Sequence, residues 1–296
     1  MSLADTLKFI VSHPLNREDK LGAFIRFIKW QIGSRIVPGE IIYEWINGAK
    51  IVARSGETGV TGNIYTGLHE FSSMGYLLHV LREGDLFVDV GANVGSYTIL
   101  ACVVKGADCW SFEPVFSTFQ RLMTNIRLNQ LEGQVKCFNI GIGDRKGKIE
   151  FTSDQDTMNP ALSDIETSDN VIMADVATLD TILENEHPKL LKIDVEGYET
   201  LVLKGAEETL KKESLHSVIM EIDGNGKRYE FDEAKILEMM SDHGFQTYSY
   251  NPLVRSLENI QGKKSNSGNT LFIRNMEMVT DILRNSPIIS IHGKQF

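Results

Sequence analysis

From residue 85 onward, short apolar runs alternate with amphipathic segments whose apolar positions recur every three to four residues. This alternation predicts a mostly parallel sheet with helices on both faces, because parallel strands need long crossover connections. Seven strands are expected, at residues 86–90, 108–113, 134–140, 189–194, 217–222, 244–250 and 269–274. Helices are expected near residues 95–104, 115–129, 178–185, 198–212 and 231–242. The last two strands lie close together without a clear helix between them, which favours an antiparallel edge.

The first 60 residues follow other patterns and are expected to form an extension to a main domain at residues 61–296. Asn47-Gly48 separates two strand-like runs, which predicts a β-hairpin of residues 40–46 and 50–53. A loop rich in glycine and threonine is expected after the hairpin, at residues 56–67, and a helix is expected at residues 69–82.

Residues 18–35 have the period of an amphipathic helix, and its apolar face consists of Leu21, Phe24, Ile25, Ile28 and Ile32. Two interpretations stay open for this helix. It packs on the domain, as most amphipathic helices do, or it contacts an anionic membrane surface or a partner.

A second hairpin is expected within the main domain, with strands at residues 148–152 and 171–176. The polar segment between them, residues 153–170, is too long for a plain connection, and we expect it to lie over the active site.

Composition narrows the class of protein. The chain has 296 residues, of which 42% are hydrophobic and 24% charged, values that exclude global disorder. Its three cysteines form neither a paired framework nor a CxxC spacing, which argues against a zinc ribbon and favours a reducing compartment. The N-terminus lacks a signal-peptide pattern and the apolar runs are short, so a cytoplasmic protein is expected.

Charge is unevenly distributed along the chain. Residues 1–35 carry six basic and three acidic side chains, whereas the whole chain has a net charge of −10, so the remaining residues sum to −13. An acidic body of this kind opposes binding to nucleic acid, and no nucleic-acid partner is expected.

The first strand-to-helix turn carries the first candidate chemistry. The strand at residues 86–90 runs into Gly91-Ala92-Asn93-Val94-Gly95, and the next helix begins at Ser96. The G-x-N-x-G spacing differs from the G-x-G-x-x-G of dinucleotide folds, which disfavours an NAD-dependent oxidoreductase. Asp89, just before the turn, would repel a pyrophosphate and suits a ligand with an ammonium group, such as S-adenosylmethionine.

The ends of the next strands add further candidates. Glu113, followed by Pro114, lies 22 residues after Gly91, at a spacing where an acidic residue can accept both ribose hydroxyls. The third strand ends at residues 140–144, where Ile142 could form an apolar wall for an adenine, and backbone groups or Asp144 could meet its edge.

Two carboxylates, Asp194 and Glu196, follow the fourth strand, at the edge where open α/β sheets bind ligands. Candidates for a general base at this edge are His69, Asp194, Glu196 and Glu221. A metal variant is also possible, in which Asp194 is joined by Glu221, Asp223 and Asn225, although no metal is the preferred expectation.

These runs together resemble the FkbM-type methyltransferases over about residues 60–275. The matching motifs are FVDVGANVGSYT (87–98), FEP (112–114), GDRKG (143–147), TLD (178–180) and LLKIDVEGYETLVLKGA (190–206). Gly67-Leu68-His69-Glu70 also resembles the family's entry motif. The resemblance implies a class I, Rossmann-like fold and S-adenosylmethionine as cofactor.

The resemblance also implies roles for individual residues. Asp194 and Glu196 would face the junction between cofactor and acceptor. From its position beside His69, Glu70 could bind the acceptor or the cofactor's ammonium group. The cofactor-binding set expected from it is Glu70, Asp89, Gly91, Ala92, Asn93, Gly95, Ser96, Glu113, Pro114, Ile142, Gly143, Asp144 and Asp194.

The expected function is transfer of a methyl group to a hydroxyl of the acceptor, which is a saccharide, a lipid-linked glycan or a natural product. Two alternatives stay open: a non-catalytic assembly partner that binds S-adenosylmethionine, and a methyltransferase acting on nucleic acid or protein. A base methyltransferase would normally carry a Pro-Pro-aromatic turn after the fourth strand, where this chain has Val195-Glu196-Gly197.

Overall fold

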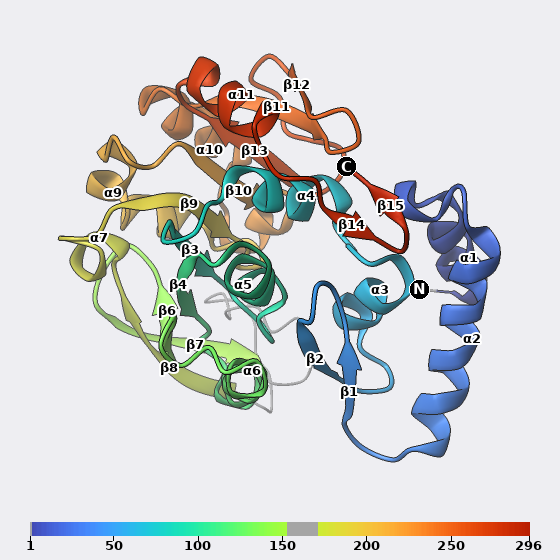
Figure 1. Cartoon of the computed structure of the whole chain (residues 1–296). Coiled ribbons are helices and arrows are strands. Elements are labelled where there is room, and N and C mark those ends of the chain that lie inside the picture. The colour runs from blue at the N-terminus through green and yellow to red at the C-terminus, as the bar shows by residue number, and fades with distance from the viewer. Residues whose placement is uncertain (1, 153–170) are drawn as a thin grey trace.

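The computed structural model describes residues 2–152 and 171–296, and its centre is an eight-stranded sheet of order β12-β11-β13-β10-β9-β3-β4-β5 (Figure 1). Its strands are β3 (Leu86–Val90), β4 (Asp108–Phe112), β5 (Val135–Phe138), β9 (Pro188–Ile193), β10 (Ser217–Glu221), β11 (Gln246–Asn251), β12 (Ser256–Asn259) and β13 (Asn269–Ile273). The run from β5 to β10 is parallel, whereas β13 lies antiparallel between β10 and β11. The expected antiparallel edge is therefore confirmed.

All seven expected strands are present, but the expected total was wrong by one. The additional strand, β12, pairs antiparallel with β11 at the edge of the sheet. Its side chains are mostly exposed, so its sequence has no apolar alternation, and backbone pairing with β11 is what makes it a strand.

Helices cover both faces of this sheet. One face packs against α4 (Phe71–Val80), α5 (Ser96–Ile99) with the π-helix Leu100–Val104 that continues it, α6 (Phe116–Leu128) and α11 (Met276–Arg284). The other face packs against α7 (Leu179–Ile182), α8 (Glu199–Lys204), α9 (Glu207–Lys211) and α10 (Glu233–Asp242). Adjacent residues of β3 serve the two faces, Phe87 the first and Val88 the second, as the two-residue period of a strand requires.

The single helix expected at residues 198–212 is interrupted at Gly205 and forms α8 and α9. A Cβ atom at Gly205 would lie 1.9 Å from the Gly143 carbonyl oxygen, so the close approach of these two backbones requires glycine.

The N-terminal extension contains α1 (Leu3–Ser12), a short 3-10 helix (Pro14–Asn16), α2 (Lys20–Ile36), β1 (Ile41–Glu44), β2 (Lys50–Ala53) and α3 (Thr58–Thr66). The expected helix and hairpin are confirmed, and both residues of the Asn47-Gly48 turn have positive φ angles, as the turn type demands. α1 was not foreseen. Neither were α11 and the C-terminal hairpin of β14 (Ser290–Ile291) and β15 (Lys294–Gln295).

The loop expected at residues 56–67 was wrong, because most of it is the buried helix α3. Glycine and threonine are poor helix formers, but burial of seven of the nine residues of α3 outweighs that preference. Gly62 has a packing role, since a Cβ atom there would lie 2.0 Å from the His69 ring.

α2 packs on the domain, but not through the face expected from its apolar pattern. The hydrophobic residues that α2 buries are Ala23, Phe27 and Trp30. They pack in one cluster with Ile51 and Ile64. The expected apolar face, which includes Leu21 and Ile32, points to solvent instead.

The second expected hairpin is confirmed as β7 (Gly147–Thr152) and β8 (Val171–Ala177), which pair antiparallel. β6 (Gly141–Ile142) adds to β8 and completes a small sheet of order β6-β8-β7. The segment at residues 153–170, expected over the active site, lies outside the described residues. Within the described part of the chain, no helix has both the length and the apolar character needed to cross a membrane.

Asn125 of α6 joins the extension to the sheet. Its buried side chain accepts a hydrogen bond from the Val52 N–H (2.8 Å) and donates one to the Val94 carbonyl (2.8 Å). The division of the chain near residue 60 stays a prediction, but this contact ties β2 directly to the turn that follows β3.

We expect Asn125→Ala to lower the free energy of unfolding by about 2–4 kcal/mol, because it leaves a buried N–H and a buried carbonyl without partners. Urea unfolding measures this loss. The control is Thr124→Ala, at the exposed neighbouring position of the same helix, which should change the free energy by less than about 0.5 kcal/mol. Equal losses in both variants would show that Asn125 does not carry this connection.

Candidate active site

The turn after β3 is the most constrained backbone of the site. Gly91, Asn93 and Gly95 have φ angles of 76°, 53° and 92°, in the left-handed region that glycine and asparagine tolerate best. A Cβ atom at Gly91 would lie 1.8 Å from the Asp194 carbonyl oxygen. The turn therefore packs directly against the end of β9, and only glycine fits at position 91.

Glu113 holds the same turn from the end of β4. Its two carboxylate oxygens accept hydrogen bonds from the N–H groups of Asn93 (3.0 Å) and Val115 (3.0 Å). Burial raises the pKa of this carboxyl group to about 7. Each oxygen keeps a lone pair, so the carboxylate can still accept hydrogen bonds from a ligand.

Asp89 lies beneath the turn rather than beside the cavity. Since neighbouring residues of a strand point to opposite faces, Val90 lines the cavity and Asp89 faces α5. There its carboxylate accepts a hydrogen bond from the Thr98 hydroxyl (2.7 Å), and only 1% of the residue is exposed. This placement gives Asp89 a structural contact and does not support direct binding of a ligand.

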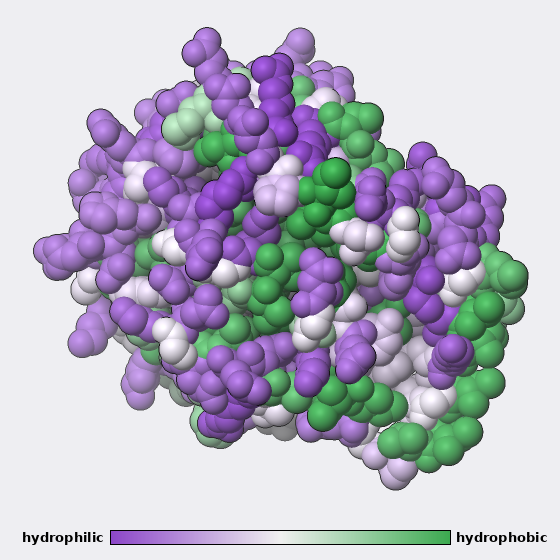
Figure 2. Space-filling view, in the orientation of Figure 1, coloured by the Kyte–Doolittle hydropathy of each residue, from purple (hydrophilic) through white to green (hydrophobic). Residues whose placement is uncertain are grey.

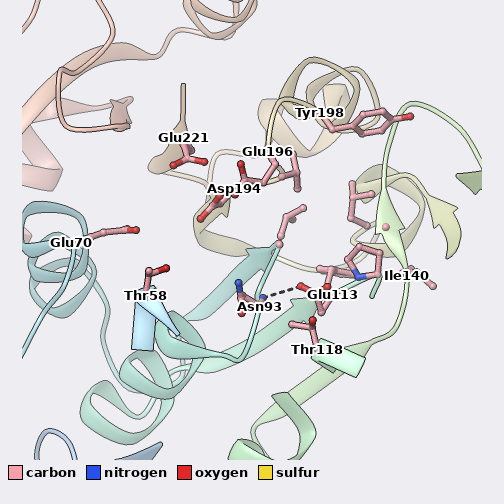
Figure 3. Close-up of a pocket in the computed structure, with 18 of the residues that line it drawn as sticks. Thr58, Glu70, Asn93, Glu113, Thr118, Ile140, Asp194, Glu196, Tyr198 and Glu221 are labelled. Atoms are coloured by element: carbon pink, nitrogen blue, oxygen red, sulfur yellow. Dashed lines mark hydrogen bonds between the residues drawn. The ribbon is translucent and has the colours of Figure 1, made fainter. Parts of the chain in front are cut away.

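A cavity of about 250 Å³ lies at the carboxyl end of the parallel strands (Figure 3). Figure 3 shows Asp194, Glu196 and Glu221 on one side of it and Asn93 and Glu113 on another. The expected residues that line it are His69, Glu70, Gly91, Asn93, Glu113, Pro114, Ile142, Asp194, Glu196 and Glu221. A smaller adjoining cavity is lined by Ala92 and Ser96, among others.

The third strand end differs in detail from the expectation. Ile140, Gly141 and Ile142 line the cavity, but Gly143 and Asp144 do not. The reason is that β6 ends at Ile142, and the chain then leaves the edge of the cavity. Gly143 packs against Val176 of β8 instead.

Lys192 is a buried cation beside the cavity, and it was not foreseen. Its ammonium group donates to an Asp194 carboxylate oxygen at 2.8 Å and lies 4.8 Å from the centre of the Tyr97 ring. Burial alone would lower the pKa of Lys192, but the carboxylates of Asp194, Asp89 and Glu70 outweigh burial and raise it. A lysine within the apolar run of β9 was the sequence signal for this pair.

Asp194 and Glu221 form a coupled pair of carboxyl groups. Burial favours the neutral form of Asp194, but the nearby Lys192 ammonium outweighs it and lowers the pKa of Asp194 overall. Burial, and then the negative charge of Asp194, raise the pKa of Glu221 well above its ordinary value. At neutral pH, Asp194 is therefore ionised and Glu221 holds a proton.

Glu196 occupies an unusual backbone position next to this pair. Its φ angle is 54°, and the N–H groups on both sides of it, those of Val195 and Gly197, donate to the Glu199 carboxylate. The Glu196 carboxylate accepts a hydrogen bond from the Asn225 side chain (3.0 Å). Burial, with the nearby charge of Asp194, raises the pKa of Glu196 to about 7.

His69 and Glu70 line the side of the cavity formed by the chain between α3 and α4. Burial lowers the pKa of His69, whose ring packs 5.2 Å from the Phe9 ring, centre to centre. The Glu70 carboxylate accepts hydrogen bonds from the Tyr97 hydroxyl and from the Asn269 side chain (2.6 Å). Both expected residues are thus at the site, with His69 neutral at pH 7.

Other lining residues were missed by sequence reasoning. Thr58 and Gly59 come from α3, which had been expected to be a loop, and Thr118 and Tyr198 come from α6 and the residue before α8. Tyr198 lies within the motif at residues 190–206, but no local pattern marks the other three, because the folding of distant segments brings them to the cavity.

Three carboxylates could hold a metal ion: oxygens of Asp194, Glu196 and Glu221 lie within 4.8 Å of one another. This set differs from the metal variant drawn from the sequence, since it contains Glu196 in place of Asp223. The Asn225 amide group donates to both Glu196 (3.0 Å) and Asp223 (2.7 Å).

The strand order, with one antiparallel strand inserted near the edge, and the glycine turn opposite Glu113 define a class I methyltransferase fold. Residues 89–247 match the methyltransferase FkbM domain, more than half of the chain. The chain therefore belongs to the FkbM methyltransferase family, which confirms the resemblance.

A curated relative is the hexuronic acid methyltransferase AglP of Haloferax volcanii, 32% identical over 148 residues. The match covers 49% of this chain and 59% of that relative.

Solved structures give weaker similarities. Methyltransferase FkbM from Methylobacillus flagellatus has a TM-score of 0.42 and 18% identity, with 74% of this chain and 55% of that chain covered. An rRNA methylase from Streptococcus thermophilus has a TM-score of 0.41 and 14% identity, with 68% and 91% covered.

We expect Gly91→Ala to lower the free energy of unfolding by about 3 kcal/mol or more, since it adds a backbone clash to an unfavourable φ angle. Gly84→Ala is a matched control, because Gly84 has the same φ of 76° but open space around it. That control should lose only about 1 kcal/mol. Urea unfolding measures both variants, and equal losses would mean that the contact with Asp194 is unimportant.

Proposed function

We propose that this protein is an S-adenosylmethionine-dependent O-methyltransferase that acts on a hydroxyl of a saccharide. The observation that carries the proposal is the Glu196 carboxyl group, which faces the cavity with a pKa of about 7 beside the ionised Asp194. Family membership and the hexuronic acid methyltransferase of Haloferax volcanii support methyl transfer to a sugar.

The lining of the cavity fits the cofactor's chemistry. The Glu113 carboxylate has lone pairs for the two ribose hydroxyls, and Ile140 and Ile142 offer an apolar wall for the adenine. The turn at Gly91 and Asn93 would lie along the methionine part. When bound, S-adenosylmethionine supplies a methyl group that is already activated on a sulfonium centre.

The protein's main tasks are then to position the acceptor hydroxyl and to accept its proton. Glu196 suits the second task, because a base with a pKa near 7 is about half ionised at neutral pH and can still hold the proton that it accepts. Asp194 is a weaker base, since Lys192 lowers its pKa. Glu221 already carries a proton, which it donates to the Asp194 carboxylate, so it is not free to act as the base.

The acceptor side of the cavity is acidic, with Glu70, Asp194, Glu196 and Glu221 among its lining residues. Among the described residues that line this cavity, none is lysine or arginine. Carboxylates accept hydrogen bonds from several sugar hydroxyls but repel a carboxylate on the acceptor. A neutral, hydroxyl-rich sugar is therefore the preferred acceptor.

A hexuronic acid offers a second candidate reaction, methyl transfer to its carboxylate, which the relative's substrate class suggests. The two reactions leave different products, because a methyl ester is cleaved by mild alkali whereas a methyl ether is stable. Transfer of labelled methyl groups to neutral sugars and to uronic acids, followed by alkali, tests both. Binding of S-adenosylhomocysteine without any methyl transfer would support the non-catalytic alternative instead.

We expect Glu196→Gln to lower kcat by about 10²–10⁴, because the acceptor proton loses its base. In the wild type, kcat should rise with pH through the Glu196 pKa of about 7, since only the ionised carboxylate accepts a proton. The variant should lack this rise while keeping its affinity for S-adenosylhomocysteine. Glu258→Gln, at an exposed site on β12, is the control, and an unchanged pH profile in Glu196→Gln would overturn the assignment.

We expect kcat to be unchanged by a chelator and by added Mg²⁺. Each carboxyl group of the acidic cluster already has a partner: Lys192 for Asp194, Asn225 for Glu196, and Asp194 for Glu221. A metal ion would have to displace these partners. Turnover measured after dialysis against EDTA, with and without Mg²⁺, tests this, and loss of activity that Mg²⁺ restores would establish a metal mechanism.

A further inference from the structure

α2 exposes a row of large apolar side chains. Its outer face carries six large apolar side chains at helical spacing, which we call the α2 stripe: Leu21, Phe24, Ile25, Ile28, Ile32 and Ile36. Their exposed fractions run from 38% for Ile28 to 73% for Ile36. Figure 2 shows hydrophobic residues along the outer edge of the molecule over this helix.

The stripe is not needed to hold α2 on the protein. The opposite face of α2 buries Phe27 and Trp30, with exposures of 5% and 6%, against residues of β2 and α3. Arg26 reinforces that side by donating to the Asn16 side chain (2.8 Å). A helix that is already anchored and still exposes a continuous apolar stripe has a second surface to cover.

Charge indicates which kind of surface this is. α2 carries four basic residues and no acidic one, although residues 36–296 sum to −13. Helical geometry places Lys20 and Lys29 on opposite flanks of the stripe, and Arg35 within its C-terminal end. All three are exposed, and their long side chains can reach anionic groups beside a buried apolar face.

We propose that α2 lies in the plane of an anionic phospholipid surface, with the α2 stripe inserted among the acyl chains and Lys20 and Lys29 at the headgroups. A second copy of the chain fits this face less well, because stripe-to-stripe packing would bring the basic flanks of two helices together. This attachment goes beyond the proposed reaction and does not depend on it.

The stripe is linked to the active site through a single helix. α2 packs on α3 through Phe27 and Tyr65, whose rings lie 5.3 Å apart, and Thr58 and Gly59 at the start of α3 line the cavity. In Figure 1, α3 lies between α2 and the sheet. A chain attached through α2 would therefore hold its cavity one helix away from the membrane.

Co-sedimentation of the full chain with phosphatidylcholine vesicles, with and without phosphatidylglycerol, tests the proposal. We expect binding that increases with phosphatidylglycerol and weakens with salt. Leu21→Ser/Ile28→Ser/Ile32→Ser should lower the partition coefficient by about tenfold or more. Val254→Ser/Ile288→Ser is the matched control, because these side chains are 66% and 67% exposed outside the stripe.

A second variant keeps the test decisive if the triple variant does not fold. Lys20→Gln/Lys29→Gln should lower binding several-fold with phosphatidylglycerol and leave binding to phosphatidylcholine alone unchanged. Circular dichroism checks that each variant is folded. Turnover of each variant on a soluble acceptor should equal that of the wild type, because membrane attachment and catalysis are separate.

Three outcomes would overturn the proposal. One is wild-type protein that does not bind phosphatidylglycerol vesicles, and another is equal binding by wild type and stripe variants. The third is a wild-type dimer in light scattering that the stripe variants convert to monomers, which would make the stripe an interface between copies.

Discussion

At Gly91 the turn after β3 approaches the Asp194 carbonyl so closely that a Cβ atom would lie 1.8 Å from its oxygen, and the rest of the site depends on this approach. The Asp194 N–H also donates to the Val90 carbonyl (3.0 Å), so the ends of β3 and β9 are joined just before both chains leave the sheet. One end directs the glycine turn towards Glu113, and the other directs Asp194 and Glu196 into the cavity. Gly91 thus allows the glycine turn beside Glu113 to lie close to the chain that carries Asp194 and Glu196.

Electrostatics provides the second constraint. Several carboxyl groups share a small volume with one buried ammonium group, and they cannot all be ionised at neutral pH. Lys192 decides which of them is charged, because its direct contact selects Asp194. Glu221 then keeps a proton and Glu196 titrates near neutrality. Three carboxyl groups with similar intrinsic chemistry acquire three different states from their positions around one cation.

Prediction from sequence succeeded where a pattern had one physical cause. Buried strands of a parallel sheet need apolar runs, so the seven strands could be located, and the Asn47-Gly48 turn located the first hairpin. It failed where distant contacts outweigh local preference. α3 is helical because its surroundings bury it, and β12 is a strand because β11 pairs with it. The sequence left the orientation of the α2 stripe open between the domain and an outside surface, because Phe27 and Trp30 offer a second apolar face that could be buried instead.

The sequence by itself determined the order of strands and helices, the glycine turn, and the acidic residues that follow the strands. These features depend on local backbone geometry and on the alternation of apolar and polar residues along one segment. Only the tertiary structure decided that Asp89 turns away from the cavity while Thr58 and Thr118 line it. Only the tertiary structure, too, set the protonation of the carboxyl groups, because burial and neighbouring charge depend on residues far apart in the chain.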